Sequence, residues 1–137
     1  MSLITWDLVD SGKHLDWSGK TKYSSYITTA TKKWNAYKKG IIRKDTVSTM
    51  KDVTISDYYD DKDTLWGETS KNGTIRFNIY NMDKDDDAGR LNTVMHEFGH
   101  ALGLGHNERK DVMSKFSNVT ELTENDKKSY DAAYRKY

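Results

Sequence analysis

Residues 96–106, which read His-Glu-Phe-Gly-His-Ala-Leu-Gly-Leu-Gly-His, constrain the fold more than any other segment of this chain. On a helix, His96 and His100 project from one face, so both ring nitrogens can reach one metal ion at about 2.0–2.1 Å. If the helix continued, His106 would lie about 9 Å beyond His100 along the helix axis and would point in another direction. Gly103, however, can take the left-handed conformation that ends a helix and reverses the chain. The segment therefore predicts a helix ending near Gly103 and a three-histidine metal site that His106 completes.

Glu97 follows the first of these histidines and is rotated about 100° from it on a helix. It is a poor ligand for the same ion but is well placed to contact a water molecule that the ion holds. Zinc lowers the pKa of such a water to about 7, and a neighbouring carboxylate can accept its proton and then protonate a departing amine. The pattern predicts hydrolysis of an amide, most naturally a peptide bond.

The composition narrows both the metal chemistry and the class of partner. The 137 residues include four His and no Cys, which excludes thiolate metal sites, disulfides and a Cys nucleophile. A formal net charge of +1 argues against a basic nucleic-acid-binding protein, and no apolar run approaches the length of a membrane span. We expect one domain over residues 1–137, a monomer, and a peptide or protein substrate.

The hydrophobic pattern predicts a small sheet and three helices. Strands are expected at Leu3–Val9, Ile41–Val47, Asp52–Tyr58, Leu65–Ser70 and Thr74–Ile79, the last two joined by an Asn72-Gly73 hairpin turn. Helices are expected from Lys22 to a stop at Gly40, from an Asp87 N-cap to Gly103, and after a capping box at Thr123 with Tyr130, Ala133 and Tyr134 facing inward.

The segment His96–His106 matches the metzincin zinc signature HExxHxxGxxH at every fixed position and, within that clan, resembles the matrixins. Metzincins also place a Met in a tight turn beneath the metal, and Asp111-Val112-Met113-Ser114 offers one. The predicted order of elements is similar to a matrixin catalytic domain over almost the whole chain. The resemblance implies an α+β, zincin-like (metzincin) fold, with an upper subdomain of about 1–105 and a lower subdomain of about 106–137.

That fold would consist of a small twisted mixed sheet, with a long N-terminal helix and the zinc-binding helix packed on it. A short C-terminal part would carry the Met-turn and the final helix. The resemblance assigns one catalytic Zn²⁺ to His96, His100 and His106, the general base and acid to Glu97, and support of the site from below to Met113.

Two segments are expected to contact substrate by resemblance. Leu65, Trp66 and Gly67 belong to an edge strand above the metal, which would pair with an extended peptide. Ser114, Lys115 and Phe116 would form the wall of the pocket that receives the residue after the scissile bond. A competing interpretation places Trp66 in the ordinary core. Most relatives act outside the cell, so we expect a secreted, extracellular protein, with a cytoplasmic location left open.

Several residues depart from the family pattern. Asn107 stands where matrixins typically carry Ser, and no Pro follows Met113. Only His14 lies outside the motif, so we expect no second, His-based zinc site. The Asp runs at 83–87 and 57–63 raise calcium as a weaker alternative to helix capping and solvation. Two other functions stay open: a non-catalytic zinc-bearing module that binds peptides, and a non-matrixin metzincin of narrow specificity.

Overall fold

The computed structural model describes residues 2–45 and 51–137. In that part of the chain, five strands form one sheet in the order β2-β1-β3-β5-β4. The strands are β1 (Leu15–Gly19), β2 (Ile42–Lys44), β3 (Val53–Tyr58), β4 (Gly67–Ser70) and β5 (Thr74–Asn78). Only the pairing of β4 with β5 is antiparallel, so β4 is an antiparallel edge strand on an otherwise parallel sheet.

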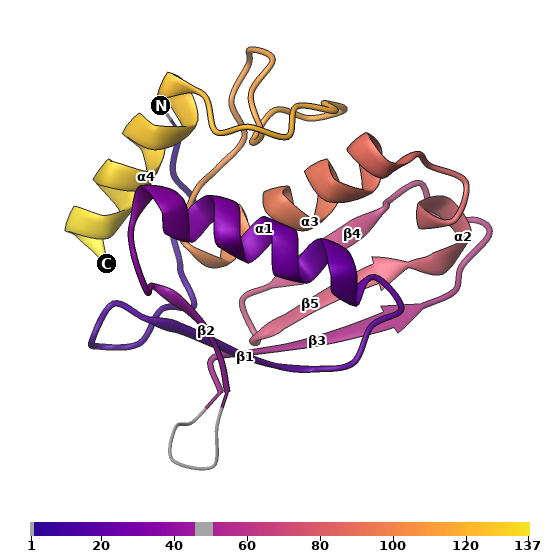
Figure 1. Cartoon of the computed structure of the whole chain (residues 1–137), viewed down its shortest axis with the longest axis horizontal. Helices are drawn as coiled ribbons and strands as arrows, with labels where there is room; N and C mark the ends of the chain where they lie inside the picture. Colours follow the sequence, from indigo (N-terminus) through magenta and orange to yellow (C-terminus); the bar gives the residue numbers. More distant parts are fainter. Residues whose placement is uncertain (1, 46–50) are drawn as a thin grey trace.

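Helices α1 (Ser24–Tyr37) and α3 (Asp87–Ala101) pack side by side over this sheet (Figure 1). Their apolar residues recur at helical spacing, and the buried set on α1 is Ile27, Ala30 and Trp34. The Trp34 indole donates a hydrogen bond of 3.0 Å to the backbone oxygen of Met95. Alternate residues of β3 and β5, among them Ile55 and Phe77, complete the core.

Helix α4 (Glu124–Lys136) begins at the predicted capping box, which the structure confirms. The Thr123 hydroxyl accepts from the Asp126 amide, and the Asp126 carboxylate accepts from the Thr123 amide. The predicted hairpin is also confirmed, since Gly73 lies in the turn between β4 and β5 with φ of +97°. The prediction that Tyr134 faces inward is wrong, because this residue is 37% exposed and does not face the core.

The prediction of a first strand at Leu3–Val9 is wrong. This segment makes one isolated bridge, from Leu3 to Leu104, and runs beside the end of α3. The amides of Ile4 and Leu8 donate to the backbone oxygens of Gly103 and Ala101 at 3.0 and 2.9 Å. These are carbonyls that a helix C-terminus leaves without intrahelical partners, so the apolar segment is used to cover the end of α3.

The first strand of the sheet is instead β1, which the sequence pattern did not indicate. It contains Asp16, which is buried and pairs bidentately with the Arg43 guanidinium at 2.7 and 3.0 Å. The remaining boundaries differ by a few residues: β4 begins at Gly67, and Asp86 rather than Asp87 caps α3. The short helix α2 (Ile79–Met82) was not predicted, and the predicted end of a strand at Val47 lies outside the described residues.

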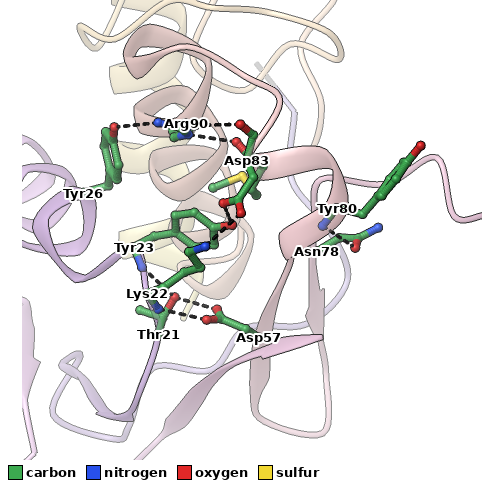
Figure 2. Close-up of polar contacts among 10 residues, drawn as sticks. Thr21, Lys22, Tyr23, Tyr26, Asp57, Asn78, Tyr80, Asp83 and Arg90 are labelled. Carbon is green, nitrogen blue, oxygen red and sulfur yellow. Dashed lines mark hydrogen bonds and ion pairs between the residues drawn. The ribbon is translucent and has the colours of Figure 1, made fainter. Parts of the chain in front are cut away.

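The Asp runs considered for calcium instead anchor helix termini (Figure 2). Asp57 accepts from the Thr21 hydroxyl at 2.6 Å and from the Lys22 amide at 2.9 Å, just before α1. Asp83 accepts from the Tyr23 hydroxyl at 2.7 Å and the Lys22 ammonium at 2.8 Å. Within the described residues neither run brings three carboxylates together as metal ligands would require. These contacts tie the start of α1 to the sheet and to the segment that leads into α3.

Candidate active site

The three motif histidines converge on one point. His96 and His100 extend from the same face of α3, and His106 returns to them after the helix has ended. The Nε2 atom of His106 lies 3.0 Å from that of His96 and 3.2 Å from that of His100. Ligands at about 2.0–2.1 Å on the corners of a tetrahedron are roughly 3.3 Å apart, so this donor set fits a zinc ion.

The reversal of the chain occurs at Gly103, as the sequence predicts. Its φ is +100°, in the left-handed region that favours glycine. The amide of Leu104 donates back to the Gly99 oxygen at 2.9 Å, and the Gly105 amide donates to the Ser2 oxygen at 2.9 Å. The loop between His100 and His106 is therefore held by backbone hydrogen bonds on both sides.

Two of the histidines have their outer ring nitrogens fixed by backbone oxygens. His96 Nδ1 lies 2.9 Å from the Val112 oxygen, and His100 Nδ1 lies 2.8 Å from the Leu104 oxygen. A carbonyl can only accept, so each Nδ1 carries the proton and each Nε2 keeps a free lone pair for a metal. Burial lowers the pKa of His96 to about 3 and of His100 to about 4, which favours the neutral, metal-binding form.

Glu97 lies between the histidine face of α3 and strand β4, and its side chain is buried. Its carboxylate oxygen Oε1 is 2.7 Å from the hydroxyl oxygen of Thr69. Burial raises the pKa of Glu97 to about 7, against an ordinary value of 4.5, because the charged form loses solvation. A carboxyl group with such a pKa can exchange a proton near neutral pH.

Met113 is fully buried and packs against helix α3. Its side chain occupies the space beside Gly99, where an added Cβ would lie 2.2 Å from the Met113 sulfur. Asn107, which stands where matrixins typically carry Ser, is buried here. Its backbone amide donates a hydrogen bond of 2.9 Å to the backbone oxygen of Met113. The turn is thus packed against α3 between the positions of His96 and His100.

The residues expected to contact substrate fall in two places. Leu65 and Trp66 precede the edge strand β4 and are 45% and 36% exposed, and Gly67 packs against Glu97. Phe116 is 96% exposed and Lys115 is exposed, both on the segment that leaves the Met-turn. Ser114 is buried in that turn, where its hydroxyl accepts from the Asp111 amide at 3.0 Å.

Two residues that contact the candidate site were not identified from the sequence. Thr69 reaches Glu97 because it follows Gly67 by two positions and therefore lies on the same face of β4. Asp126 was interpreted only as part of a capping box, yet its carboxylate also accepts from the amides of Val112 and Met113 at 2.8 and 3.1 Å. The signal for Thr69 was the strand alternation after Gly67, whereas no local pattern links Asp126 to the Met-turn.

Among the described residues, no helix combines the length and apolar character that crossing a membrane requires. No curated protein matches the chain significantly. In a solved structure described as the GM1 bound form of the ECX AB5 holotoxin, one chain is similar to it with a TM-score of 0.59. That similarity covers 90% of this chain and 80% of the other at 16% identity, so it concerns the fold alone. The matrixin family model matches residues 38–135, and the chain therefore belongs to the matrixin family of peptidases.

Proposed function

We propose that this protein is a zinc-dependent endopeptidase, in which His96, His100 and His106 hold the metal and Glu97 is the general base and then the general acid. One observation carries the proposal: three Nε2 lone pairs converge on one side of α3, next to a buried carboxyl group on the same helix. A zinc ion held there would supply a polarising charge and a water molecule of lowered pKa.

Glu97 supplies the proton transfers. Its buried carboxylate accepts the proton of the attacking water and returns it to the nitrogen of the departing amine. In the metal-free protein, burial raises the pKa of Glu97 above its ordinary value, and this favours proton uptake by the carboxylate. The family match favours a peptidase of the matrixin type over a metzincin outside the matrixins.

The substrate proposal concerns the free edge of β4. An extended peptide would add to this edge as a further strand, with Leu65 and Trp66 beside it and Lys115 and Phe116 on the opposite side of the histidines. We also propose that the α+β architecture is of the metzincin type, with residues 1–105 above the cleft and 106–137 below it. Extracellular action is proposed on family resemblance alone.

The test is the variant Glu97→Ala. We expect it to bind one zinc per chain, as measured by metal analysis after dialysis, because the three histidines remain. Cleavage of casein should fall on the order of 10²–10⁴-fold, since a positioned base contributes that much. Casein cleavage at the wild-type rate would exclude Glu97 as the base. Stable peptide binding by a wild-type protein that does not cleave would instead support the binding module.

His106→Ala tests the metal site and has a matched control in His14→Ala. His106 is one of three converging nitrogens, whereas His14 lies outside the motif in the loop before β1. We expect dialysed His106→Ala to lose zinc and activity and His14→Ala to keep both. Equal zinc content in the two variants would show that His106 is not a ligand.

A further inference from the structure

Strand β4 contacts the catalytic helix at the position of Glu97. Gly67 and Thr69 are two residues apart, so both face α3, while Glu68 and Ser70 face away. A Cβ at Gly67 would lie 3.1 Å from Cγ of Glu97, which shows how closely the strand backbone approaches this side chain. The edge strand proposed to receive substrate is therefore also the strand that packs on the proposed base.

The Thr69 hydroxyl has two acceptors on Glu97. Its oxygen lies 2.7 Å from the carboxylate Oε1 and 2.9 Å from the backbone oxygen of the same residue. When the carboxylate is ionised, the hydroxyl can donate to Oε1. When Oε2 has taken up a proton, Oε1 is a carbonyl oxygen and can still accept from the hydroxyl. Oε1 therefore keeps a partner before and after Glu97 takes up a proton.

We infer that Thr69 is a positioning residue for Glu97, a role that rests on the proposed peptidase function. Its hydroxyl holds Oε1 and leaves Oε2 as the oxygen that exchanges the proton with the water and the leaving group. A free Glu side chain has three rotatable bonds, and a base displaced by about 1 Å can lose on the order of 10² in rate. The Thr69 side chain thus fixes the proposed base and is not itself one of the proposed metal ligands.

The test compares Thr69→Val, which keeps the shape and removes the hydroxyl, with Thr69→Ser, which keeps the hydroxyl. The matched control is Thr74→Val, because Thr74 lies on β5 opposite Ser70 and its side chain faces away from α3. For Thr69→Val we expect kcat to fall about 10- to 100-fold with KM within about two-fold, as loss of a hydrogen bond to a charged group predicts. Thr69→Ser should recover most of kcat, and Thr74→Val should match the wild type.

A wild-type kcat in Thr69→Val, or an equal loss in Thr69→Ser, would overturn this inference and leave the peptidase proposal intact. An inactive wild-type enzyme would overturn the peptidase proposal itself. The contact can be measured without activity in the metal-free protein: Thr69→Val should lower the urea midpoint less in a Glu97→Ala background than in the wild type. Equal decreases in the two backgrounds would show that the hydroxyl does not bind the carboxylate.

Discussion

The two sides of the candidate site are built differently. Below the histidines, the Met-turn is buried, and the Asp126 carboxylate accepts from the amides of Val112, Met113 and Thr123 at 2.8 to 3.1 Å. Asp111 in the same turn accepts from the Thr123 hydroxyl at 2.5 Å. These contacts link the turn to the start of α4.

Above the histidines, β4 is a four-residue edge strand whose residues are all half-buried. Its polar link to the site is the Thr69 hydroxyl, and a Cβ added at Gly67 would lie 3.1 Å from Cγ of Glu97. His96, one of the proposed metal ligands, therefore depends on the buried lower side through the Val112 oxygen, whereas the proposed base Glu97 depends on the open upper side. Substitutions below should reduce stability and zinc affinity, and those above should reduce catalysis with little loss of stability.

The largest expected effect is that of Asp126→Ala on the lower side. It leaves three backbone amides without their acceptor, two of them in the buried Met-turn, so the free energy of unfolding should fall by about 3–5 kcal/mol. Zinc affinity should also fall, because Val112 fixes the ring of His96 through its backbone oxygen. Urea denaturation and competitive metal titration measure the two effects.

Asp86→Ala is the control for this variant, because Asp86 also caps a helix but touches no part of the Met-turn. Its carboxylate accepts from the Gly89 amide at 2.8 Å, and its loss should cost about 1 kcal/mol. Equal costs for the two variants would mean that Asp126 acts only as a cap, and the proposed difference between the two sides would disappear.

The pH dependence of stability tests the burial of Glu97 on the upper side. In metal-free protein, the folded state holds the Glu97 proton up to about pH 7, whereas the unfolded state releases it near 4.5. Relative to Glu97→Gln, the wild type should therefore be most stable below about pH 4.5 and lose on the order of 2–3 kcal/mol as pH rises to about 7. Urea denaturation in a chelator, repeated across this range, measures the difference; a constant difference would contradict it.

Two glycines give a matched pair across the site. A Cβ at Gly99 would meet the Met113 sulfur at 2.2 Å, while one at Gly67 would meet the Glu97 Cγ at 3.1 Å. We expect Gly99→Ala to cost about 1–3 kcal/mol through overpacking and Gly67→Ala less, because the Glu97 side chain can shift. Adding Met113→Ala should relieve part of the Gly99→Ala cost. Equal costs at Gly67 and Gly99 would mean that the two sides are equally rigid.

The convergence of the three histidines could be predicted from the sequence because its geometry is local. A spacing of four places His96 and His100 on one helix face, and a glycine at the helix end accounts for His106. The contacts that hold these residues are not local: Thr69 is 28 residues from Glu97, and Asp126 is 13 residues from Met113. No periodic pattern encodes either contact, since both depend on how the elements pack.

The wrong prediction of a first strand at Leu3–Val9 has a similar cause. The segment Leu3–Val9 carries the apolar pattern of a strand, but its apolar residues cover the end of α3. Strand β1 carries a buried Asp16, which does not fit a hydrophobic strand pattern and which its pairing with Arg43 helps to stabilise. A charged pair 27 residues apart could not be recognised before the parallel pairing of β1 with β2 was known.

The smallest expected effect on stability is that of Trp66→Ala at the upper edge. Trp66 is 36% exposed and precedes β4, so it is not the core residue that the competing interpretation supposed. We expect the free energy of unfolding to change by less than about 1 kcal/mol, whereas Trp34→Ala, which empties a fully buried site, should cost about 3–5 kcal/mol. If a peptide binds along β4, KM for a peptide substrate should rise several-fold in Trp66→Ala, while kcat stays near the wild-type value, because the base and the metal ligands are untouched. A large loss of stability with an unchanged KM would make Trp66 a core residue and would remove the main support for an open, substrate-binding upper side.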